Sequence, residues 1–207
     1  MNFIDLIDYA GTFAFAISGI RLASAKQFDW FGAYVVGLVT AIGGGTTRDL
    51  LLNVTPFWML QPSYLVVTGI ALLSVILLGK YLIRLNNTFF IFDAIGLGLF
   101  VVVGIEKTLA VNFPFWVAIV MGMITGSVGG IIRDILINEV PLIFRKDIYA
   151  LACVVGGLVF FSCSKFEMSS AIIQIATASS VIMTRVLAVR YHWSLPVLKG
   201  NNDTINS

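Results

Sequence analysis

Long runs with few or no charged residues recur along this 207-residue chain, and they limit what it can fold into. A helix that crosses a lipid bilayer needs about 20 predominantly apolar residues. Runs of about this size lie at 9–20, 28–47, 60–79, 88–105, 108–132, 148–164 and 168–184. Hydrophobic residues make up 58% of the chain and charged residues 12%, with a mean hydropathy of +0.96, which is more apolar than a soluble domain requires. The sequence therefore predicts an all-α integral membrane protein with seven transmembrane helices.

Other classes of protein find little support in the sequence. Cys153 and Cys163 fall in one apolar run, where a helix would hold them about 15 Å apart, so neither a disulfide nor a metal site is predicted. A net charge of +2 without a basic, aromatic-rich stretch argues against binding to nucleic acid. No Ser-His-Asp set, HExxH, phosphate loop or cysteine-rich motif is present. We therefore expect no catalytic residues, no enzyme activity, no cofactor and no bound metal.

The positive residues predict how the chain sits in the membrane. With seven spans, nine Lys and Arg residues fall on one side and two on the other, and the remaining two lie within or beside spans. The nine are Arg21, Lys26, Lys80, Arg84, Arg145, Lys146, Arg185, Arg190 and Lys199, and the two are Lys107 and Lys165. By the positive-inside rule, the C-terminus is expected in the cytoplasm and the N-terminus outside, with the chain in the cell inner (plasma) membrane.

An internal repeat appears when the chain is compared with itself at an offset of 85 residues. Residues 44–56 and 129–141 share the pattern Gly-Gly-x-x-Arg-Asp-x-x-x-Asn-x-x-Pro, and at the same offset Asp8 matches Asp93. Each copy holds three spans, an odd number, so the second copy must be inverted. Inverted repeats are a known basis of transport proteins. We expect a first three-helix repeat at 1–85, a second, inverted one at 86–166, a seventh helix at 167–192 and a cytoplasmic tail at 193–207.

Glycines cluster at matched points of the second and fifth spans. Glycine weakens a helix by up to about 1 kcal/mol relative to alanine, so each cluster predicts a kink or an unwound turn. The freed carbonyls and hydroxyls would need water or passing ions as partners. Close helix packing is an alternative role, and the two roles are compatible. The predicted pore or kink residues are Gly43, Gly44, Gly45, Thr46, Thr47, Gly126, Ser127, Gly129 and Gly130.

Ionisable residues at membrane depth are costly unless they are paired or hydrated, so they should face the protein interior. The residues of this kind are Asp8, Arg48, Asp49, Asp93, Arg133 and Asp134. Neighbouring helix positions point about 100° apart, so each arginine is expected to reach another helix rather than the aspartate beside it. The repeat predicts that Arg48 pairs with Asp8 and Arg133 with Asp93, as two symmetric gating latches. An ion-pair network that only orients helices is the alternative.

Pro56 and Pro141 close the two motifs and are expected to end the helices, with the side chains of Asn53 and Asn138 available as caps. His192 lies between two aromatic residues, a composition typical of the membrane interface. We assign it no catalytic role.

The doubled motif resembles that of a bacterial membrane family named for a repeated "glycine transporter" domain, which is similar in turn to the trimeric intracellular cation (TRIC) channels. The resemblance covers about residues 5–165. It implies a seven-helix protomer, a homotrimer, and an ion path inside each protomer lined by helices 1, 2, 4 and 5. Members of this group conduct potassium and, less selectively, sodium. The partners that it implies are therefore potassium and sodium ions, membrane lipids and further copies of the chain.

Two functions remain open from the sequence. One is a monovalent-cation channel with one pore per protomer, and the other is a secondary transporter of glycine or a similar small zwitterion. A channel needs a continuous polar path, whereas a carrier needs a closed mid-membrane pocket with a carboxylate site at a half-helix N-terminus. In a cation path, the charges of Arg48 and Arg133 must be neutralised by aspartate partners or must move as gates.

Overall fold

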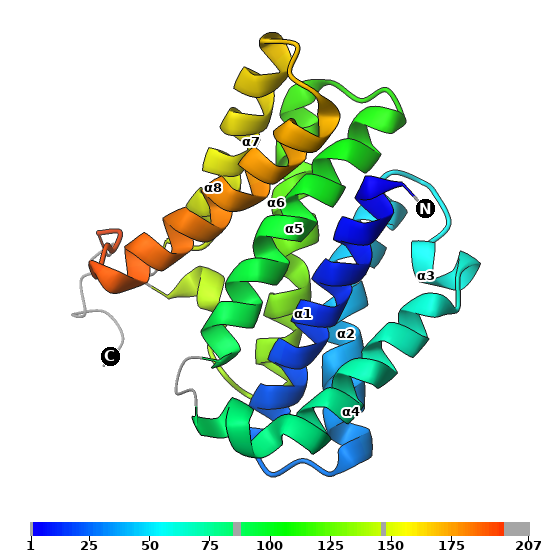
Figure 1. Cartoon of the computed structure of the whole chain (residues 1–207), viewed down its shortest axis with the longest axis vertical. Helices are drawn as coiled ribbons and strands as arrows, with labels where there is room; N and C mark the ends of the chain where they lie inside the picture. The colour runs from blue at the N-terminus through cyan, green and yellow to red at the C-terminus, as the bar shows by residue number, and fades with distance from the viewer. Residues whose placement is uncertain (1, 85–87, 146–147, 197–207) are drawn as a thin grey trace, which may run out of the picture.

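The computed structural model describes residues 2–84, 88–145 and 148–196. In this part of the chain there are seven long helices and two short helical turns, and no strand (Figure 1). The long helices are α1 (Phe3–Ala25), α2 (Trp30–Leu51), α4 (Ser63–Arg84), α5 (Thr88–Ala110), α6 (Phe115–Leu136), α7 (Ala150–Lys165) and α8 (Ser170–Arg190), and the short turns are α3 (Phe57–Leu60) and η1 (Leu142–Phe144). The predicted all-α fold with seven long helices is confirmed.

The boundary between the fourth and fifth predicted spans differs from the structure. The uncharged runs placed it near residues 106–107, but α5 continues to Ala110 and α6 begins at Phe115. Lys107 is therefore in the last turn of α5 rather than in a loop, where a positive charge complements the helix dipole. Pro114, which lacks an amide hydrogen, is the residue before α6 and fixes where that helix begins.

Several helices end on a residue in the left-handed conformation. Asn53 follows α2 with a φ of 56°, and Asn138 follows α6 with a φ of 58°. Such a residue lets the chain turn while amides just past the helix bond its last carbonyls. Both asparagines thus end their helices through their backbone conformation, and Pro56 and Pro141 then begin the short turns.

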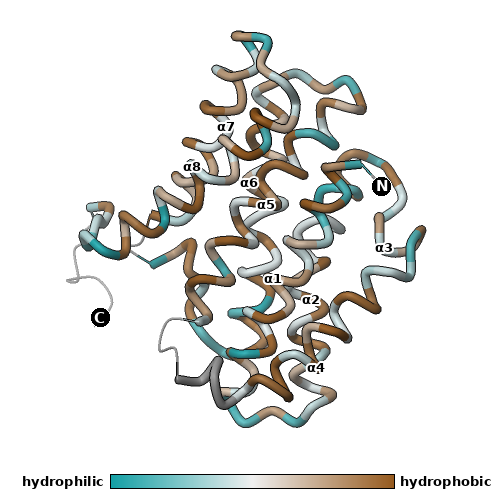
Figure 2. The backbone as a smooth tube through the Cα atoms, viewed as in Figure 1, coloured by the Kyte–Doolittle hydropathy of each residue, from teal (hydrophilic) through white to brown (hydrophobic). Residues whose placement is uncertain are grey.

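The surface of the bundle is largely apolar. By length and composition, four of the described helices could each cross a membrane, namely α1, α5, α6 and α8. Large side chains such as Trp30, Phe31 and Leu77 remain more than 70% exposed. Figure 2 shows hydrophobic residues along the helices, with hydrophilic ones mostly at the loops. Soluble monomers rarely expose apolar patches on this scale, whereas a lipid-facing surface requires them.

The two repeats run in opposite directions (Figure 1). α1 starts at the end of the bundle that carries the N-terminus, and α5, its counterpart, finishes there. α1, α2, α5 and α6 form the centre, with α4 on one flank and α7 and α8 on the other. Phe15 and Phe100, which are equivalent in the two repeats, meet with ring centroids 5.1 Å apart, so a local two-fold axis passes near them. We call the two ends of the bundle the N-terminal end and the C-terminal end.

Candidate functional site

α2 and α6 cross at their glycine clusters. A Cβ atom on Gly44 would collide with the carbonyl oxygen of Thr125, and one on Gly129 would collide with the carbonyl oxygen of Thr40. Only glycine allows two helix backbones to approach so closely. The same contact is made twice with the repeats exchanged, as the two-fold arrangement requires.

The two helices continue through the glycine clusters without a break, and no glycine in the described residues has a positive φ. The predicted unwound turn is therefore wrong for this conformation, because the glycines serve close packing while the carbonyls stay in the helix. A kink at these positions stays a prediction. The other cluster glycines also face neighbours: Gly43 lies against Ile132, Gly45 against Phe57, Gly126 against Leu97 and Gly130 against Tyr149.

The hydroxyls of the predicted pore residues bond within their own helices. Thr46, Thr47 and Ser127 each donate to the carbonyl four residues earlier, at 2.7, 2.9 and 2.7 Å. Thr46 Oγ1 also accepts a hydrogen bond from the indole of Trp58 at 3.1 Å. Back-bonding of this kind uses the hydroxyl proton and leaves oxygen lone pairs as the groups available to a cation or water.

The first repeat holds Arg48 against its sequence neighbour. Arg48 Nε and Nη2 both donate to Asp49 Oδ1, at 2.8 and 2.6 Å. The expectation that these two residues could not pair is wrong, because the long arginine side chain folds back along α2. Asp49 Oδ2 accepts the backbone N–H of Phe57 at 2.8 Å, which ties the turn after Pro56 to the helix end.

Asp8 forms an ion pair with a different cation from the one predicted. Lys107 Nζ lies 2.7 Å from Asp8 Oδ2, and the hydroxyl of Tyr64 donates to the same oxygen at 3.0 Å. Among the described residues Arg48 forms no ion pair with Asp8, so the predicted latch at this end is wrong. The Phe57 ring contacts both cations, at 5.9 Å from Arg48 Cζ and 4.9 Å from Lys107 Nζ. We call Asp8, Arg48, Asp49, Tyr64 and Lys107 the first cluster.

The second repeat does form the predicted pair. Arg133 Nη1 donates to Asp93 Oδ1 at 2.6 Å and to Ser18 Oγ at 2.8 Å, and Arg133 Nε donates to Asp134 Oδ1 at 2.8 Å. Asp134 Oδ2 accepts the backbone N–H of Leu142 at 3.0 Å, as Asp49 does in the first repeat. We call Ser18, Asp93, Arg133 and Asp134, with the nearby Tyr149, the second cluster. Its gating role stays a proposal.

Two differences in sequence explain why the clusters differ. At the 85-residue offset, Lys107 corresponds to Leu22 and Ser18 corresponds to Val103. The first cluster therefore has an extra cation that takes its aspartate, and the second has an extra hydroxyl that helps to hold its arginine. Sequence reasoning missed Lys107 because it was placed in a loop. Two features of the sequence could have identified Lys107 as a partner of Asp8. They are the match of Asp8 with Asp93 and the single lysine near the end of α5.

A cavity lies beside each cluster, and the two cavities are equivalent under the repeat. The cavity at the N-terminal end has a volume of about 270 Å³, and the one at the C-terminal end about 350 Å³. The first is lined by residues that include Asp49, Leu52, Val54, Phe57, Lys107 and Val111, and the second by their counterparts Asp134, Ile137, Glu139, Leu142, Leu22 and Lys26. Each cavity thus reaches the aspartate of its motif from one end of the bundle.

The rim of the C-terminal cavity is charged where its counterpart is apolar. Lys26 Nζ lies 2.7 Å from Glu139, and Arg145 lies 3.4 Å from the same carboxylate. The hydrogen bond from Lys26 lowers the pKa of Glu139 below its ordinary value. The bond from Lys26 joins the loop after α1 to the loop after α6. Within the described residues, no group of three or more His, Cys, Asp or Glu side chains is placed to hold a metal ion.

An all-helical membrane protein made of two inverted repeats, with a buried ionic cluster and a cavity toward each end, has the architecture of a membrane transport protein. The model of the family described as "Glycine transporter" matches the chain twice, at residues 5–80 and 90–165. The chain belongs to this family.

Several relatives and solved structures are similar to this chain. A UPF0126 membrane protein of Vibrio cholerae is 42% identical over 94% of this chain and 82% of its own length, and the UPF0126 inner membrane protein YadS of Escherichia coli is 40% identical over 92% and 93%. The structure of a TRIC trimeric intracellular cation channel orthologue from Rhodobacter sphaeroides superposes with a TM-score of 0.84 and 31% identity, covering 93% of this chain and 100% of that one. A structure described in terms of conductance through TRIC cation channels also has a TM-score of 0.84, with 34% identity, and covers 97% and 99%.

Proposed function

We propose that the protein is a passive channel for monovalent cations that conducts potassium and, less selectively, sodium, with one ion path in each protomer. The observation that carries the proposal is the pair of equivalent cavities that approach the two motif aspartates from opposite ends of the bundle. The similar solved structures of TRIC cation channels support it. Enzyme activity forms no part of the proposal, since the family and the fold are those of channels.

We infer that the proposed path is closed between the cavities in this conformation. The glycine crossing of α2 and α6 and the Phe15–Phe100 pair fill the centre of the bundle. Conduction then requires α2 and α6 to separate, which moves the arginines that follow the glycines on each helix. We infer that the two clusters act as gates: their aspartates neutralise the arginines in the closed state, and rearranged pairing opens each end.

A carrier for glycine is the second candidate, favoured by the name of the family whose model matches. A carrier of this kind needs a half-helix N-terminus near mid-membrane to hold the carboxylate of its substrate. Both glycine-bearing helices are continuous here, so neither presents such a terminus. The geometry therefore supports the channel better than the carrier.

Purified protein in liposomes tests the two candidates side by side, with potassium flux measured in one arm and uptake of labelled glycine in the other. Empty liposomes are the control. We expect potassium flux that grows without saturation over the accessible concentration range and no glycine uptake. Saturable glycine uptake without potassium flux would overturn the channel proposal in favour of the carrier.

We also propose a homotrimer in the inner membrane, with the N-terminus outside and the C-terminus in the cytoplasm. The proposed orientation is based on the distribution of the positive residues. Labels near Met1 and Lys199 would report it best, but both of these residues lie outside the described residues. Single cysteines at Gln27 and Asn112, in loops at opposite ends of the bundle, report it as well. In a background without Cys153 and Cys163, we expect an impermeant reagent added outside the cell to label Asn112→Cys and not Gln27→Cys; the reverse pattern contradicts the orientation.

A further inference from the structure

Arg185 on α8 is buried without an acidic partner. It is 1% exposed, its Nη1 donates to the carbonyl of Ile148 at 3.2 Å, and its Nε has no hydrogen-bond partner. Among the described residues no carboxylate forms an ion pair with it, in contrast to Arg48 and Arg133. Burial of a cation is costly unless an opposite charge compensates it. Within the described residues the charge of Arg185 is therefore uncompensated.

Two aromatic rings hold the guanidinium in place. The ring centroids of Phe90 and Tyr149 lie 5.3 and 4.6 Å from Arg185 Cζ. Cation–π contacts stabilise the charge only partly and leave the N–H groups at the edge of the guanidinium free to bond an acceptor. The side chain is thus fixed while its guanidinium, which lines a cavity, makes a single hydrogen bond to the described part of the chain, at Nη1, and this is the arrangement of a preformed anion site.

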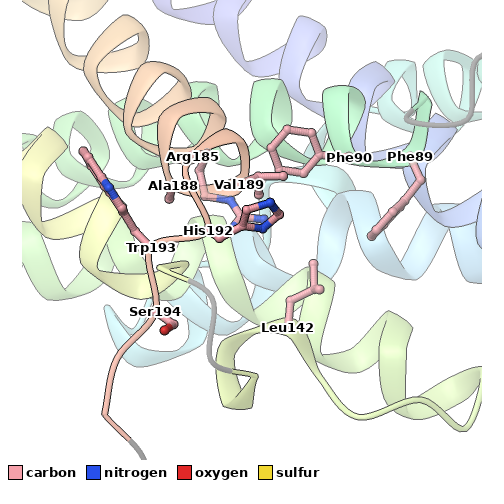
Figure 3. Close-up of a pocket in the computed structure, with 9 residues that line it drawn as sticks. All are labelled: Phe89, Phe90, Leu142, Arg185, Ala188, Val189, His192, Trp193 and Ser194. Carbon is pink, nitrogen blue, oxygen red and sulfur yellow. The ribbon is translucent and has the colours of Figure 1, made fainter.

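Arg185 lines a cavity of about 430 Å³ at the C-terminal end of the bundle (Figure 3). The segment after α8 contributes His192, Trp193 and Ser194 to its lining, and the start of α5 contributes Phe89 and Phe90. Imidazole, hydroxyl and indole groups thus line the same cavity as the guanidinium. Tryptophan beside basic residues is typical of the depth at which lipid headgroups lie.

The cavity continues along a largely apolar side of α8. A second cavity of about 450 Å³ shares Phe90, Val189 and His192 with the first and is lined further by Ile91, Val186 and Arg190. A buried cation at one end of an apolar groove matches a ligand that has an anionic head and a hydrocarbon chain. A free phosphate ion would satisfy only the first of these features.

We propose that this cavity binds the phosphate group of an anionic phospholipid, with Arg185 as its main contact and an acyl chain lying along Ile91 and Val186. The site uses α8, which is outside the repeat, so the first repeat has no counterpart of it. The site stands independently of the proposed channel function.

The lipid site shares a wall with the C-terminal cavity. Phe89 and Leu142 line both. The Phe89 ring centroid lies 4.8 Å from Arg133 Cζ, and the Leu142 amide donates to Asp134. Occupation of the site therefore acts on two residues that hold the second cluster. This coupling, unlike the binding itself, rests on the proposed channel function.

Quenching of Trp193 fluorescence by brominated lipids tests the binding. Purified protein in a neutral detergent is titrated with phosphatidylglycerol or phosphatidylcholine that carries bromine on its acyl chains, and the Trp193 signal is obtained by subtracting a Trp193→Phe variant. We expect half-quenching at a roughly tenfold lower concentration of phosphatidylglycerol than of phosphatidylcholine, as one charge-assisted hydrogen bond would give. Arg185→Gln should abolish this preference.

Three controls make the test decisive. Lys26→Gln removes an exposed cation at the same end of the bundle that lines neither cavity of the site, and it should keep the preference. An equal loss in Lys26→Gln and Arg185→Gln would mean diffuse surface charge and overturn the site. If Arg185→Gln does not fold, Ser194→Glu places a competing carboxylate at the cavity mouth, and the preference should fall there and persist in Ser194→Gln. Displacement of phosphatidylglycerol by millimolar inorganic phosphate, in wild type and Lys26→Gln alike, would identify a soluble anion as the ligand and overturn the lipid. A preference unchanged in Arg185→Gln also overturns the proposal.

Discussion

The two repeats share a backbone arrangement and differ in the charges it carries. In both, the motif aspartate accepts the amide of the residue after proline, at 2.8 Å in the first repeat and 3.0 Å in the second. In the first, however, Arg48 pairs with one carboxylate and Asp8 belongs to Lys107, whereas in the second Arg133 pairs with two carboxylates. Inverted symmetry thus specifies where the groups lie, and single substitutions decide which of them pair.

The difference also separates the two clusters by their access to water. Arg133 and Asp93 are completely buried, whereas the Lys107 side chain keeps 34% of its surface exposed. A buried network resists change, whereas an ion pair with one partly exposed partner is screened more and can be exchanged for water or ions. In the proposed channel, the N-terminal cluster is therefore the more responsive gate and the C-terminal cluster the more stable one.

The largest effect should come from the feature that the repeats share most closely. Gly44→Leu and Gly129→Leu each force a side chain into a backbone carbonyl of the opposite helix, at a cost of about 5 kcal/mol or more, enough to prevent folding. Yields of monodisperse protein by size-exclusion chromatography measure this. Gly79→Leu, where a Cβ meets no atom within 4 Å, should give normal yields. A large difference between the first two variants would break the symmetry of the crossing.

Replacement of the arginines should separate the repeats. Arg133→Ala strands Asp93 and Asp134 in the interior and should lower the free energy of unfolding by about 3–5 kcal/mol. Arg48→Ala strands only Asp49, which keeps its bond from Phe57, so about half of that loss is expected. Thermal or denaturant unfolding in detergent compares the two.

Double-mutant cycles sharpen the same contrast. The coupling between Arg133 and Asp93 should exceed about 1 kcal/mol, and that between Arg48 and Asp8 should be near zero. Equal couplings for the two pairs would show that the ionic partners follow the symmetry after all, contrary to the arrangement described above.

A smaller effect is expected from Lys107, and it should appear mainly in ion flux. Lys107→Gln removes the cation from the N-terminal cavity and leaves Asp8 bonded to Tyr64, which should raise potassium conductance about fivefold through a less positive entrance. The cost in stability should be only about 1 kcal/mol because the pair is partly exposed. Lys165→Gln, an exposed lysine at the same end, is the matched control. Unchanged conductance would remove Lys107 from the ion path.

The smallest effect concerns Glu139, whose contacts have no equivalent in the first repeat. Its pKa is lowered by the hydrogen bond from Lys26, so its contribution to stability is present at neutral pH and is lost as the pH falls below about 4.5. We expect the difference in melting temperature between wild type and Glu139→Gln to be small at pH 7 and to vanish in acid. A difference that grows on acidification would contradict the sign of this shift.

The sequence was sufficient for the topology because hydrophobic length and an 85-residue repeat are both read directly from residue order. It also predicted the pair of Arg133 with Asp93, because the two residues were expected to lie at equivalent depth in the second repeat. It failed for Arg48, because which cation reaches Asp8 depends on where α5 ends, and charges within an apolar run do not mark a helix end. The unwound turn was predicted from glycine propensity alone, which the close approach of α2 and α6 overrides.

The bond from the motif aspartate to the amide after proline has a consequence for how such a protein could arise. Each bond is made inside one repeat, whereas the glycine crossing and the Phe15–Phe100 contact each need one partner from either repeat. One half can thus close its own loop but cannot complete a core. A gene encoding a single half would give a stable protein only as an antiparallel dimer, with its two copies inserted in opposite senses. Fusion of two such halves into one chain would free each copy to acquire charges suited to its own side of the membrane.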